Sequence, residues 1–596
     1  MATLTSLPVA AKGGSFLLEN RRPEEVFTPE DFTEEHRQIA ATAAKFAKEE
    51  VMPAVEAVEA KEPGAMRGLL EKAGALGFLA SDIPEEYGGL GMDKTTSAVI
   101  ADHLSVVASF STAFGAHVGI GTLPLVWYGT AEQKKKYLPK LAEAEWVAAY
   151  ALSEASSGSD AMNIRTRAVL SEDGEHYILN GEKMWITNGG IADLYTVFAK
   201  IDGEKFSAFL VERTFPGVTV GAEEHKLGIR GSSTCPLVLS DCKVPVGNLL
   251  GEAGKGHHIA FNVLNVGRFK LGVACVGGAR YALSEMIGYA KERKAFGKAI
   301  AEFGLIQRKI STSAARLYAA ESMSYRTIGM IDAALSALTE SESKESKNIQ
   351  KRIEEYAVEC SVLKVYASEA MSYVADELVG TMGGYGYVED YPAERMYRDA
   401  RINRIFEGTN EINRLIVTGW LMKRALKGEL PLLGAIKKLM DEVMQPPSFD
   451  EGDGVGDALA EEAEKLESVR KMALFAAGVA SQKYMAGLEE QQEIMADLAD
   501  MISQVFALDS ALVRARKMGS KSGAAVARAM TGLIAEESLA IANEAAKRVL
   551  AASAEGDELR TQLAILRRLG KVTPADTVAL SRAVAKECIA LERYPL

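Results

Sequence analysis

The stretch RTRAVLSEDGEHYILNGEKMWITNG, residues 165–189, decides the fold, because its apolar and polar residues alternate as they do in β-strands. The same pattern recurs in VAAYALSE (147–154), ADLYTVFAKIDGEKFSAFLVE (192–212) and CPLVLSDCKVPVGNLLG (235–251). The dipeptides Asp173-Gly174, Asn180-Gly181 and Asp202-Gly203 separate short runs, and such pairs are typical of two-residue hairpin turns. We therefore predict a β domain over residues 147–256.

Helical periodicity flanks this β domain on both sides. Residues 28–51, TPEDFTEEHRQIAATAAKFAKEEV, begin with capping Thr and Asp residues and then place apolar residues three and four positions apart. The same spacing returns after residue 257 and is interrupted by GTMGGYGYVEDYP (380–392). The Pro/Gly/Asp-rich stretch MQPPSFDEGDGVGD (444–457) is typical of a linker, and the residues after it are rich in helix formers.

These patterns predict an α+β multidomain protein, which agrees with a chain of 596 residues that is too long for one hydrophobic core. The expected segments are an N-terminal extension (1–34), an N-terminal helical domain (35–146), the β domain (147–256), a second helical domain (257–430), a linker (431–456) and an additional C-terminal helical domain (457–596).

Charge and cysteine content exclude several classes of protein. The net charge of −13 argues against nucleic acid as a main partner, because phosphate backbones need a basic face. The five cysteines form no CxxC pair and the seven histidines are scattered, so we expect no metal site and a reduced, cytoplasmic protein. The N-terminus has neither the pattern of a signal peptide nor that of an Arg-rich transit segment.

One uncharged stretch is long enough to span a bilayer. From Leu104 to Ala131 the chain carries no Asp, Glu, Lys or Arg over 28 residues. It is crowded with Ser, Thr and Gly, however, and contains a His and a Pro. We therefore predict a buried helix and turn inside a globular domain.

Three stretches carry residues suited to a polar ligand, and each also has an ordinary structural interpretation. YALSEASSGSD (150–160) places serines and a glycine at a strand end, as an ordinary Ser-rich turn does. KMWITNGG (183–190) puts Trp185 and Thr187 on one side of a strand, where they edge a flat ring or belong to the core. ERKAFGK (292–298), expected on a helix, is a phosphate site or a solvated basic face.

Glu407 stands in RINRIFEGTNEINRLIV (401–417), a strip that is otherwise apolar and basic except for Glu411. One interpretation is a surface ion pair with Arg404, which would contribute about 0–1 kcal/mol. The other is a catalytic base whose pKa apolar surroundings raise above the usual value of about 4.3. Such a base has to lie within hydrogen-bond reach of the proton that it removes.

Taken together, YALSEASSGSD, NGEKMWITNG, ERKAFGK, MGGYGY and RIFEGTNEI resemble the motifs of the acyl-CoA dehydrogenase family, in order, from about residue 35 to 425. LNVGRF (264–269), FGLIQ (303–307), FGAH (114–117) and the helical region after 445 are similar to the very-long-chain type and to related long bacterial enzymes. The resemblance implies that the β domain is a barrel and that residues 257–430 form a four-helix bundle.

The resemblance also implies a set of FAD-binding residues. Those lining the flavin would be Tyr150, Leu152, Ser153, Gly158, Ser159, Trp185, Ile186 and Thr187. Those holding the pyrophosphate across a subunit interface would be Arg293, Phe296, Gly380, Thr381, Met382, Gly383 and Gly384. Thr409 and Glu411 would touch the same cofactor.

For the substrate, the resemblance implies that Ser159, Asn265, Arg268 and Gly408 face the acyl-CoA. It makes Glu407 the base that removes the α-proton. Some branches of the family carry this base on the helix near LNVGR instead, but this sequence has Gly267 there and no carboxylate nearby.

Small residues in the uncharged stretch bear on the length of the acyl chain. Gly115, Ala116, Gly119 and Gly121 stand where shorter-chain relatives tend to place bulkier or charged side chains. Missing side chains would leave room for more methylenes, each contributing about 0.8 kcal/mol when buried. The alternative is that these residues only allow close helix packing. We expect a preference for long acyl chains.

The expected activity is therefore the α,β-dehydrogenation of fatty acyl-CoA by an FAD enzyme that passes its electrons to an electron-transfer flavoprotein. An acyl-CoA oxidase that uses oxygen and a non-catalytic flavin-bound assembly protein are the alternatives. We expect a homodimer, because the additional helices would cover the surface that shorter members use to pair two dimers. Membrane association is not expected, because the linker is short and acidic.

Overall fold

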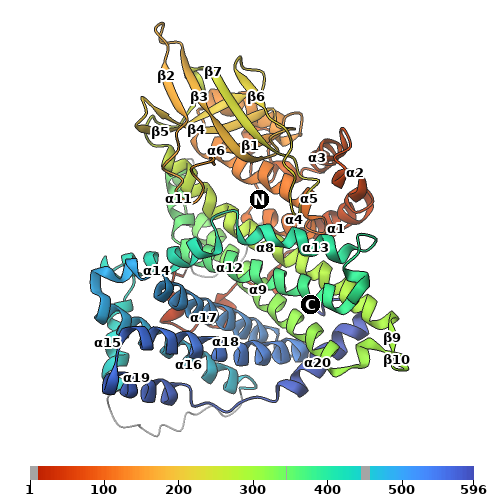
Figure 1. Ribbon diagram of the computed structural model, residues 1–596, viewed down its shortest axis with the longest axis vertical. Helices are drawn as coiled ribbons and strands as arrows, with labels where there is room; N and C mark the ends of the chain where they lie inside the picture. The colour runs from red at the N-terminus through yellow and green to blue at the C-terminus, as the bar shows by residue number, and fades with distance from the viewer. Residues whose placement is uncertain (1–10, 344, 444–456) are drawn as a thin grey trace.

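The protein is built from a β layer, a central helical layer and a C-terminal helical bundle, which follow one another along its long axis (Figure 1). A computed structural model describes residues 11–343, 345–443 and 457–596. In Figure 1 the yellow sheet lies at the top and the blue helices of the C-terminal part lie at the bottom. The predicted α+β class, with helices before and after one β domain, is confirmed.

Short helices precede the sheet and surround a core of their own. They are α1 (Glu34–Phe46), α2 (Val55–Glu59), α3 (Ala65–Ala75), α4 (Lys94–His103), α5 (Ala108–Ala116), α6 (Leu123–Tyr128) and α7 (Ala131–Ala142). The uncharged stretch Leu104–Ala131 folds into α5, the π-helix η7 (His117–Gly121) and α6, and most of it is buried. The prediction of a buried helix and turn is confirmed.

His117 fastens this turn to the sheet. Its Nδ1 accepts a hydrogen bond from the backbone N–H of Ala148 at 3.0 Å, and its Nε2 lies 2.9 Å from the carbonyl oxygen of Leu141. Burial lowers the pKa of His117 to about 4, so the ring is neutral and Nε2 carries the proton that it donates. The histidine therefore has a structural role.

The strands of the β domain form one eight-stranded sheet. They are β1 (Ala148–Ala151), β2 (Arg167–Leu170), β3 (His176–Thr187), β4 (Leu194–Ile201), β5 (Lys205–Glu212), β6 (Val218–Val220), β7 (Thr234–Pro245) and β8 (Leu249–Leu250). The order is β6-β7-β3-β2-β4-β5-β8, and β1 pairs in parallel with β4. This pairing sets the start of the Ser-rich motif beside the middle of the sheet.

Two of the three predicted turns are correct. Asp173-Gly174 connects β2 to β3, and Asp202-Gly203 connects β4 to β5. The prediction for Asn180-Gly181 is wrong, because this pair lies inside β3 at a shift of register against β7. A Cβ on Gly181 would lie 2.4 Å from the Oγ1 of Thr166, so the glycine permits a close approach and forms no turn.

The second helical domain has four long helices among its described residues, as a four-helix bundle requires. They are α8 (Gly256–Glu292), α9 (Gly304–Ser336), α12 (Ala357–Met382) and α14 (Asn410–Leu426). Shorter elements connect them: α10 (Glu340–Ser343), α11 (Ser346–Glu354), η10 (Gly383–Gly386), α13 (Pro392–Ala400) and η11 (Arg401–Arg404). Of the helices in the described ranges, α8 alone is long and apolar enough to cross a membrane, and 72% of its most apolar window is buried inside the protein.

The motif ERKAFGK is not helical beyond its first residue, so that prediction is wrong. Helix α8 ends at Glu292, and β9 (Lys294–Ala295) and β10 (Lys298–Ala299) form a small hairpin. Phe296 and Gly297 have φ angles of 52° and 83°, as a type I′ turn requires. The turn leaves the Phe296 side chain 96% exposed.

The predicted linker over 431–456 is wrong for its first half. Residues Leu432–Val443 form helix α15, because Leu432, Leu439 and Val443 recur on one face and are buried. Residues 444–456, which carry the Pro/Gly/Asp pattern, lie outside the described residues. The additional bundle comprises α16 (Ala460–Tyr484), α17 (Gln492–Met518), α18 (Ala524–Ser553), α19 (Gly556–Leu569) and α20 (Thr577–Leu591).

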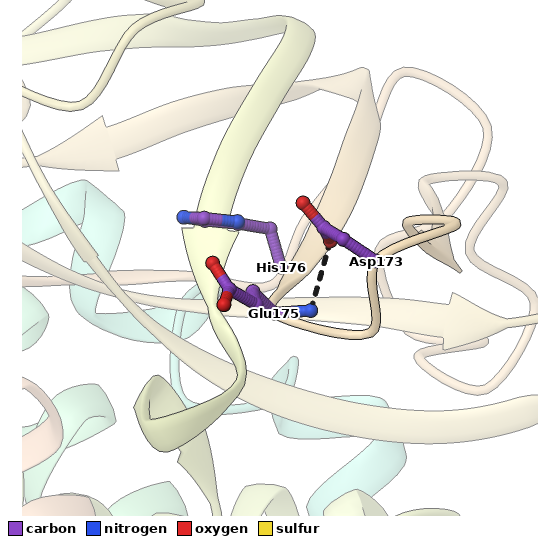
Figure 2. A group of neighbouring side chains, drawn as sticks. All are labelled: Asp173, Glu175 and His176. Atoms are coloured by element: carbon purple, nitrogen blue, oxygen red, sulfur yellow. Dashed lines mark hydrogen bonds between the residues drawn. The ribbon is translucent and has the colours of Figure 1, made fainter.

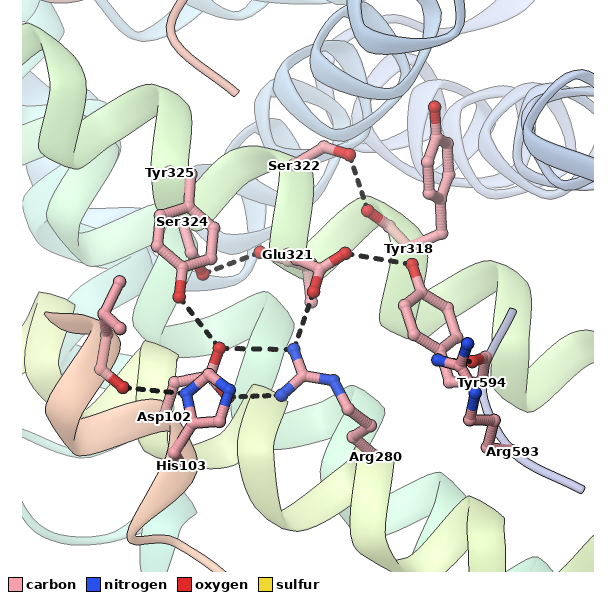
Figure 3. A network of polar contacts seen from close by, with 12 residues as sticks. Asp102, His103, Arg280, Tyr318, Glu321, Ser322, Ser324, Tyr325, Arg593 and Tyr594 are labelled. Atoms are coloured by element: carbon pink, nitrogen blue, oxygen red, sulfur yellow. Dashed lines mark hydrogen bonds and ion pairs between the residues drawn. The ribbon is translucent and has the colours of Figure 1, made fainter. Parts of the chain in front are cut away.

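A buried polar network joins this additional bundle to the rest of the protein (Figure 3). Glu321 of α9 accepts hydrogen bonds from Arg280 of α8 and from Arg514 of α17, both at 2.6 Å. Arg280 also bonds to Asp102 of α4, and the hydroxyl of Tyr594 donates to Glu321 at 3.0 Å. The two guanidinium groups hold the pKa of Glu321 down to about 2.

Candidate active site

A cavity with about 1250 Å³ of empty space opens between the helical domains, beside the sheet. Its lining is mainly apolar and comes from α4, α5, η7, α8, α12, α13 and η11. The sequence-predicted residues that line it are Gly115, Ala116, Gly119, Thr187 and Glu407, whereas Gly121 does not. The fold thus brings together residues that are almost 300 positions apart in the chain.

Glu407 lies at the cavity on a short connection between η11 and α14. Its φ angle is 58°, which is uncommon for a residue with a side chain, and Gly408 follows with 79°. Lys364 of α12 holds this connection, because its Nζ donates to the carbonyl oxygen of Gly408 at 2.7 Å. Asn413 Nδ2 donates to the same oxygen at 2.8 Å. These two hydrogen bonds hold the backbone at Glu407 and Gly408 in a conformation that is unfavourable for a residue with a side chain.

The carboxylate of Glu407 is isolated from polar partners. Its Oε2 is buried and accepts no hydrogen bond from any residue that the structure describes. Burial raises the pKa of Glu407 to about 7, and the nearby charges of Arg268 and Lys364 oppose that rise. No ion pair joins Glu407 to Arg404 in the described part of the chain, so the surface-pair interpretation is wrong. A buried carboxylate with a pKa near 7 suits a general base.

Gly267 of α8 leaves the space that this carboxylate occupies. A Cβ at position 267 would lie 2.4 Å from Glu407 Oε2 and 2.7 Å from its carboxyl carbon. Position 267, which the sequence analysis considered as the alternative place for a base, therefore lies directly against the Glu407 carboxylate. A side chain at position 267 and the observed position of that carboxylate exclude each other on steric grounds.

A strip of exposed or unpaired groups lies at the end of β3 and in the Ser-rich loop, and its member Thr187 lines the same cavity. Trp185 has a φ angle of 58° and is 55% exposed, which contradicts its interpretation as a core residue. Buried Ile186 separates it from Thr187, whose hydroxyl, like that of Ser153, has no hydrogen-bond partner within the described residues. An open indole face beside unpaired hydroxyls fits the flat, polar ring system of a flavin.

The sequence analysis did not predict the contact between two residues that hold this strip in place. Glu154 and Lys183 form a buried ion pair of 2.7 Å. Glu154 also accepts hydrogen bonds from Thr166, and Lys183 donates to the carbonyl oxygen of Leu152 at 3.2 Å. The pair thus clamps the Ser-rich loop onto β3. Its members are 29 positions apart, so no local pattern indicates the contact.

The residues implied for the pyrophosphate lie in a different pocket. Arg293, Thr381, Met382, Gly383 and Gly384 line it together. The Oγ1 of Thr381 is buried without a partner, and the Arg293 guanidinium lies 5.9 Å from the ring of Tyr385. Phe296 projects from the neighbouring hairpin into solvent. Within one chain, these residues and the strip around Thr187 border separate cavities.

The remaining implied residues are distributed around Glu407 and the Ser-rich loop. Asn265 Oδ1 accepts a hydrogen bond from Arg268 at 2.8 Å, and both residues are buried. Thr409 caps α14 through Ile412 N. Of the others, Leu152 is buried and Tyr150 is partly buried. Gly158, Ser159, Gly380 and Glu411 are exposed.

A group of three side chains with metal-ligating atoms lies at the opposite end of β3 from Thr187, on the turn between β2 and β3 and on the first residue of β3 (Figure 2). Asp173, Glu175 and His176 have ligand atoms within 4.8 Å of one another. Asp173 and Glu175 are exposed, and Asp173 accepts hydrogen bonds from Ser171 and from Glu175 N, as in an ordinary polar turn. The arrangement is explained without an ion.

Comparison with known proteins identifies the family. Residues 33–145 match the description "Acyl-CoA dehydrogenase, N-terminal domain", residues 149–242 the middle domain, and residues 254–422 and 468–568 two C-terminal domains of that family. The chain belongs to the acyl-CoA dehydrogenase family. The resemblance that the sequence motifs indicated is thereby confirmed.

Individual relatives agree with this assignment. A probable acyl-CoA dehydrogenase of Bacillus subtilis (strain 168) is 48% identical over 98% of both chains. The human mitochondrial very long-chain specific acyl-CoA dehydrogenase is 36% identical, over 82% of this chain and 75% of its own. The crystal structure of an acyl-CoA dehydrogenase complexed with FAD from Bacillus anthracis has a TM-score of 0.96 and 47% identity, covering 98% of this chain and all of that one.

The chain is therefore an FAD-dependent acyl-CoA dehydrogenase. The unpaired hydroxyls of Ser153 and Thr187 and the exposed Trp185 fit the flavin ring, and Thr187 lines the cavity that contains Glu407. The unpartnered hydroxyl of Thr381 fits a polar group at the second pocket.

Proposed function

We propose that this enzyme converts long-chain fatty acyl-CoA to trans-2-enoyl-CoA in fatty-acid β-oxidation, with Glu407 as the base. The observation that carries the proposal is the unpaired Glu407 carboxylate beside a mainly apolar cavity, whose empty space is about 1250 Å³ with the solvent at its mouth included. Burying methylenes along such a cavity contributes about 0.8 kcal/mol each, which favours long chains. The small residues Gly115 and Ala116 keep part of that volume open.

In this mechanism Glu407 removes the α-proton of the thioester, and bound FAD supplies the acceptor for the β-hydrogen. The backbone N–H of Glu407 has no acceptor within the described residues. It is therefore free to donate to the thioester carbonyl oxygen and to stabilise the negative charge that develops there. Arg268 and Lys364 keep positive charge near the base, which limits the rise of its pKa.

The acceptor of the electrons that we propose is an electron-transfer flavoprotein, in keeping with the family to which the chain belongs. An oxidase would share the fold and the base, so that the two activities differ only in how the reduced flavin is reoxidised. Slow consumption of oxygen by the reduced enzyme, compared with fast transfer to the flavoprotein, supports the dehydrogenase. Rapid oxygen consumption would support the oxidase.

We also propose that the enzyme is a cytoplasmic homodimer without membrane association. The separation of the Arg293 pocket from the cavity of Glu407 supports the dimer, because a second copy would let one cofactor contact both sets of residues. Co-sedimentation with anionic vesicles at physiological salt would contradict the absence of membrane association.

The experiment that tests the proposed function is an anaerobic titration of the purified flavoprotein with saturated acyl-CoAs of graded length. Bleaching of the flavin absorbance by chains of roughly twelve or more carbons is expected, because these bury the most methylenes. Stronger bleaching by butyryl-CoA than by palmitoyl-CoA would contradict the chain-length proposal. No bleaching by any acyl-CoA would contradict the proposed activity itself.

A further inference from the structure

Three buried charged side chains form a cluster at the wall of the acyl cavity, apart from Glu407. The Nζ of Lys270 donates to Asp82 Oδ2 at 2.6 Å, and the Nζ of Lys94 donates to Asp82 Oδ1. Ser97 Oγ donates to the same Asp82 Oδ2 at 2.8 Å. The three charged side chains are between 3% and 10% exposed. Lys270 and Ser97 line the cavity, while Asp82 and Lys94 do not.

The cluster carries an unbalanced positive charge. Two lysines share one aspartate, which leaves a charge of +1 when all three groups are ionised. The charges that act on Lys270 are those of Asp82 and Lys94. Two acids next to the first turn of α4 are engaged elsewhere: Asp93, its N-cap residue, pairs with His36, and Asp332 of α9 accepts the N–H groups of Lys94 and Thr95. A buried, uncompensated cation is costly, so an anion at this wall would be favourable.

Lys270, the lysine that lines the cavity, has N–H groups that are not used in hydrogen bonds with the described residues. An ammonium group has three N–H donors, and Lys270 uses one of them on a partner within the described residues. Lys270 lies one helical turn beyond Gly267 on α8, so about 4.5 Å along the helix axis from the residue that faces Glu407. A purely hydrocarbon tail would offer this ammonium group no second acceptor besides Asp82.

We propose that Lys270, supported by Asp82, Lys94 and Ser97, binds an anionic oxygen on the acyl chain of the substrate, in particular a terminal carboxylate. The substrate class is the monothioester of a dicarboxylic acid with coenzyme A. This proposal rests on the proposed acyl-CoA dehydrogenation, and it adds a second recognition point to the cavity. The carboxylate would accept the two unused N–H groups of Lys270 and balance the charge of the cluster.

The test compares, at each chain length, a saturated acyl-CoA with the acyl-CoA that ends in a carboxylate. The measured quantity is kcat/KM for anaerobic flavin reduction by the holoenzyme. The acyl chains compared have six to sixteen carbons. At one or more lengths the wild-type enzyme should prefer the carboxylate-ended chain. Lys270→Met should reduce this preference by about tenfold or more, as expected for the loss of a charge-assisted hydrogen bond. Asp82 keeps Lys94 and Ser97 as partners in that variant.

Lys94→Met is the matched control, because it removes the same charge from the same aspartate without removing a group that lines the cavity. Because Lys94→Met removes the excess charge but leaves the ammonium donor of Lys270 at the cavity wall, it should reduce the preference clearly less than Lys270→Met does, and Lys270→Arg should retain the preference. The proposal is overturned if wild-type enzyme prefers the saturated chain at every length, or if both methionine variants change the preference equally. Reduction by saturated chains alone would leave the proposed function intact while refuting this site.

Discussion

At the residue scale, the role that we propose for Glu407 as the base comes with a cost in stability, because the carboxylate is buried. Glu407→Gln is nearly isosteric, so we expect the fold and FAD content to remain while the rate of flavin reduction by acyl-CoA falls by at least about 10³-fold. Stopped-flow measurement of flavin bleaching tests this. A variant that reduces at nearly the wild-type rate would refute the assignment of the base.

The same residue links activity and stability to pH in opposite directions. Its pKa is raised to about 7, so kcat/KM should increase as pH rises through about 7 and the carboxylate forms. Folding, in contrast, favours the protonated acid, and stability falls as pH rises from about 4.5, the ordinary value, through 7. At pH 8 Glu407→Gln should therefore melt at the same temperature as the wild type or higher, in a calorimetric scan.

Gly267 controls the position of the base. Gly267→Ala should improve the intrinsic helix propensity of α8 by about 1 kcal/mol, but its Cβ would displace the Glu407 carboxylate. We expect flavin reduction to slow by about a hundredfold, as for a misplaced catalytic group. Gly288→Ala is the matched control on the same helix, because a Cβ there contacts nothing within 4 Å. Equal rates for the two variants would refute this role.

At the scale of the element, the end of α5 and the π-helix η7 shape the acyl cavity. Ala116 is buried and lines the cavity beside Gly115 and Gly119. Ala116→Leu would fill space that long tails occupy, so we expect the ratio of kcat/KM for palmitoyl-CoA to that for octanoyl-CoA to decrease. Unchanged flavin absorbance is the control for FAD binding. An unchanged chain-length profile would show that these small residues serve helix packing.

At the scale of the whole molecule, Arg514 couples the additional bundle to the catalytic domain. It bonds to Glu321 on α9 and to Glu30 near the N-terminus, and it is almost fully buried. Arg514→Met should reduce the free energy of unfolding by about 3–5 kcal/mol, the usual cost of breaking a buried ion pair. Arg516→Met, which removes a more exposed pair with Asp457, is the control and should change it by about 1 kcal/mol or less.

The effect of Arg514→Met should depend on pH. Since the pKa of Glu321 is lowered to about 2, the stability that the network contributes is present above about pH 4.5 and is lost as pH falls toward 2. The difference in unfolding free energy between wild type and Arg514→Met should shrink over the same range. A difference independent of pH would contradict the electrostatic origin of this coupling.

The assembly is also a property of the whole molecule. Light scattering should give twice the mass of the 64.1 kDa chain. Arg293→Ala should release FAD, because we assign this residue to the cofactor of the neighbouring copy. A tetramer mass, or a monomer that retains its flavin, would contradict the proposed dimer.

The sequence by itself determined the order of the helical and β regions, the buried nature of residues 104–131, and the position of Glu407 in its motif. These features depend on local periodicity and on short motifs, which residues close in the chain create. Sequence reasoning failed at Asn180-Gly181, at ERKAFGK and in the first half of the predicted linker. Gly181 lies in a strand because it packs closely against Thr166, and ERKAFGK contains a tight turn that ends the helix. The first half of the predicted linker is helical because its apolar residues are buried on one face.

Only the tertiary structure decided how these motifs act together. It placed Gly267 against the carboxylate of Glu407, paired Glu154 with Lys183, and set two lysines on Asp82 beside the cavity. The pKa of Glu407 is likewise a tertiary property, because it arises from burial and from Arg268 and Lys364 on other helices. Burial and charge depend on what packs around a residue in space, and that information is not contained in any one segment of the chain.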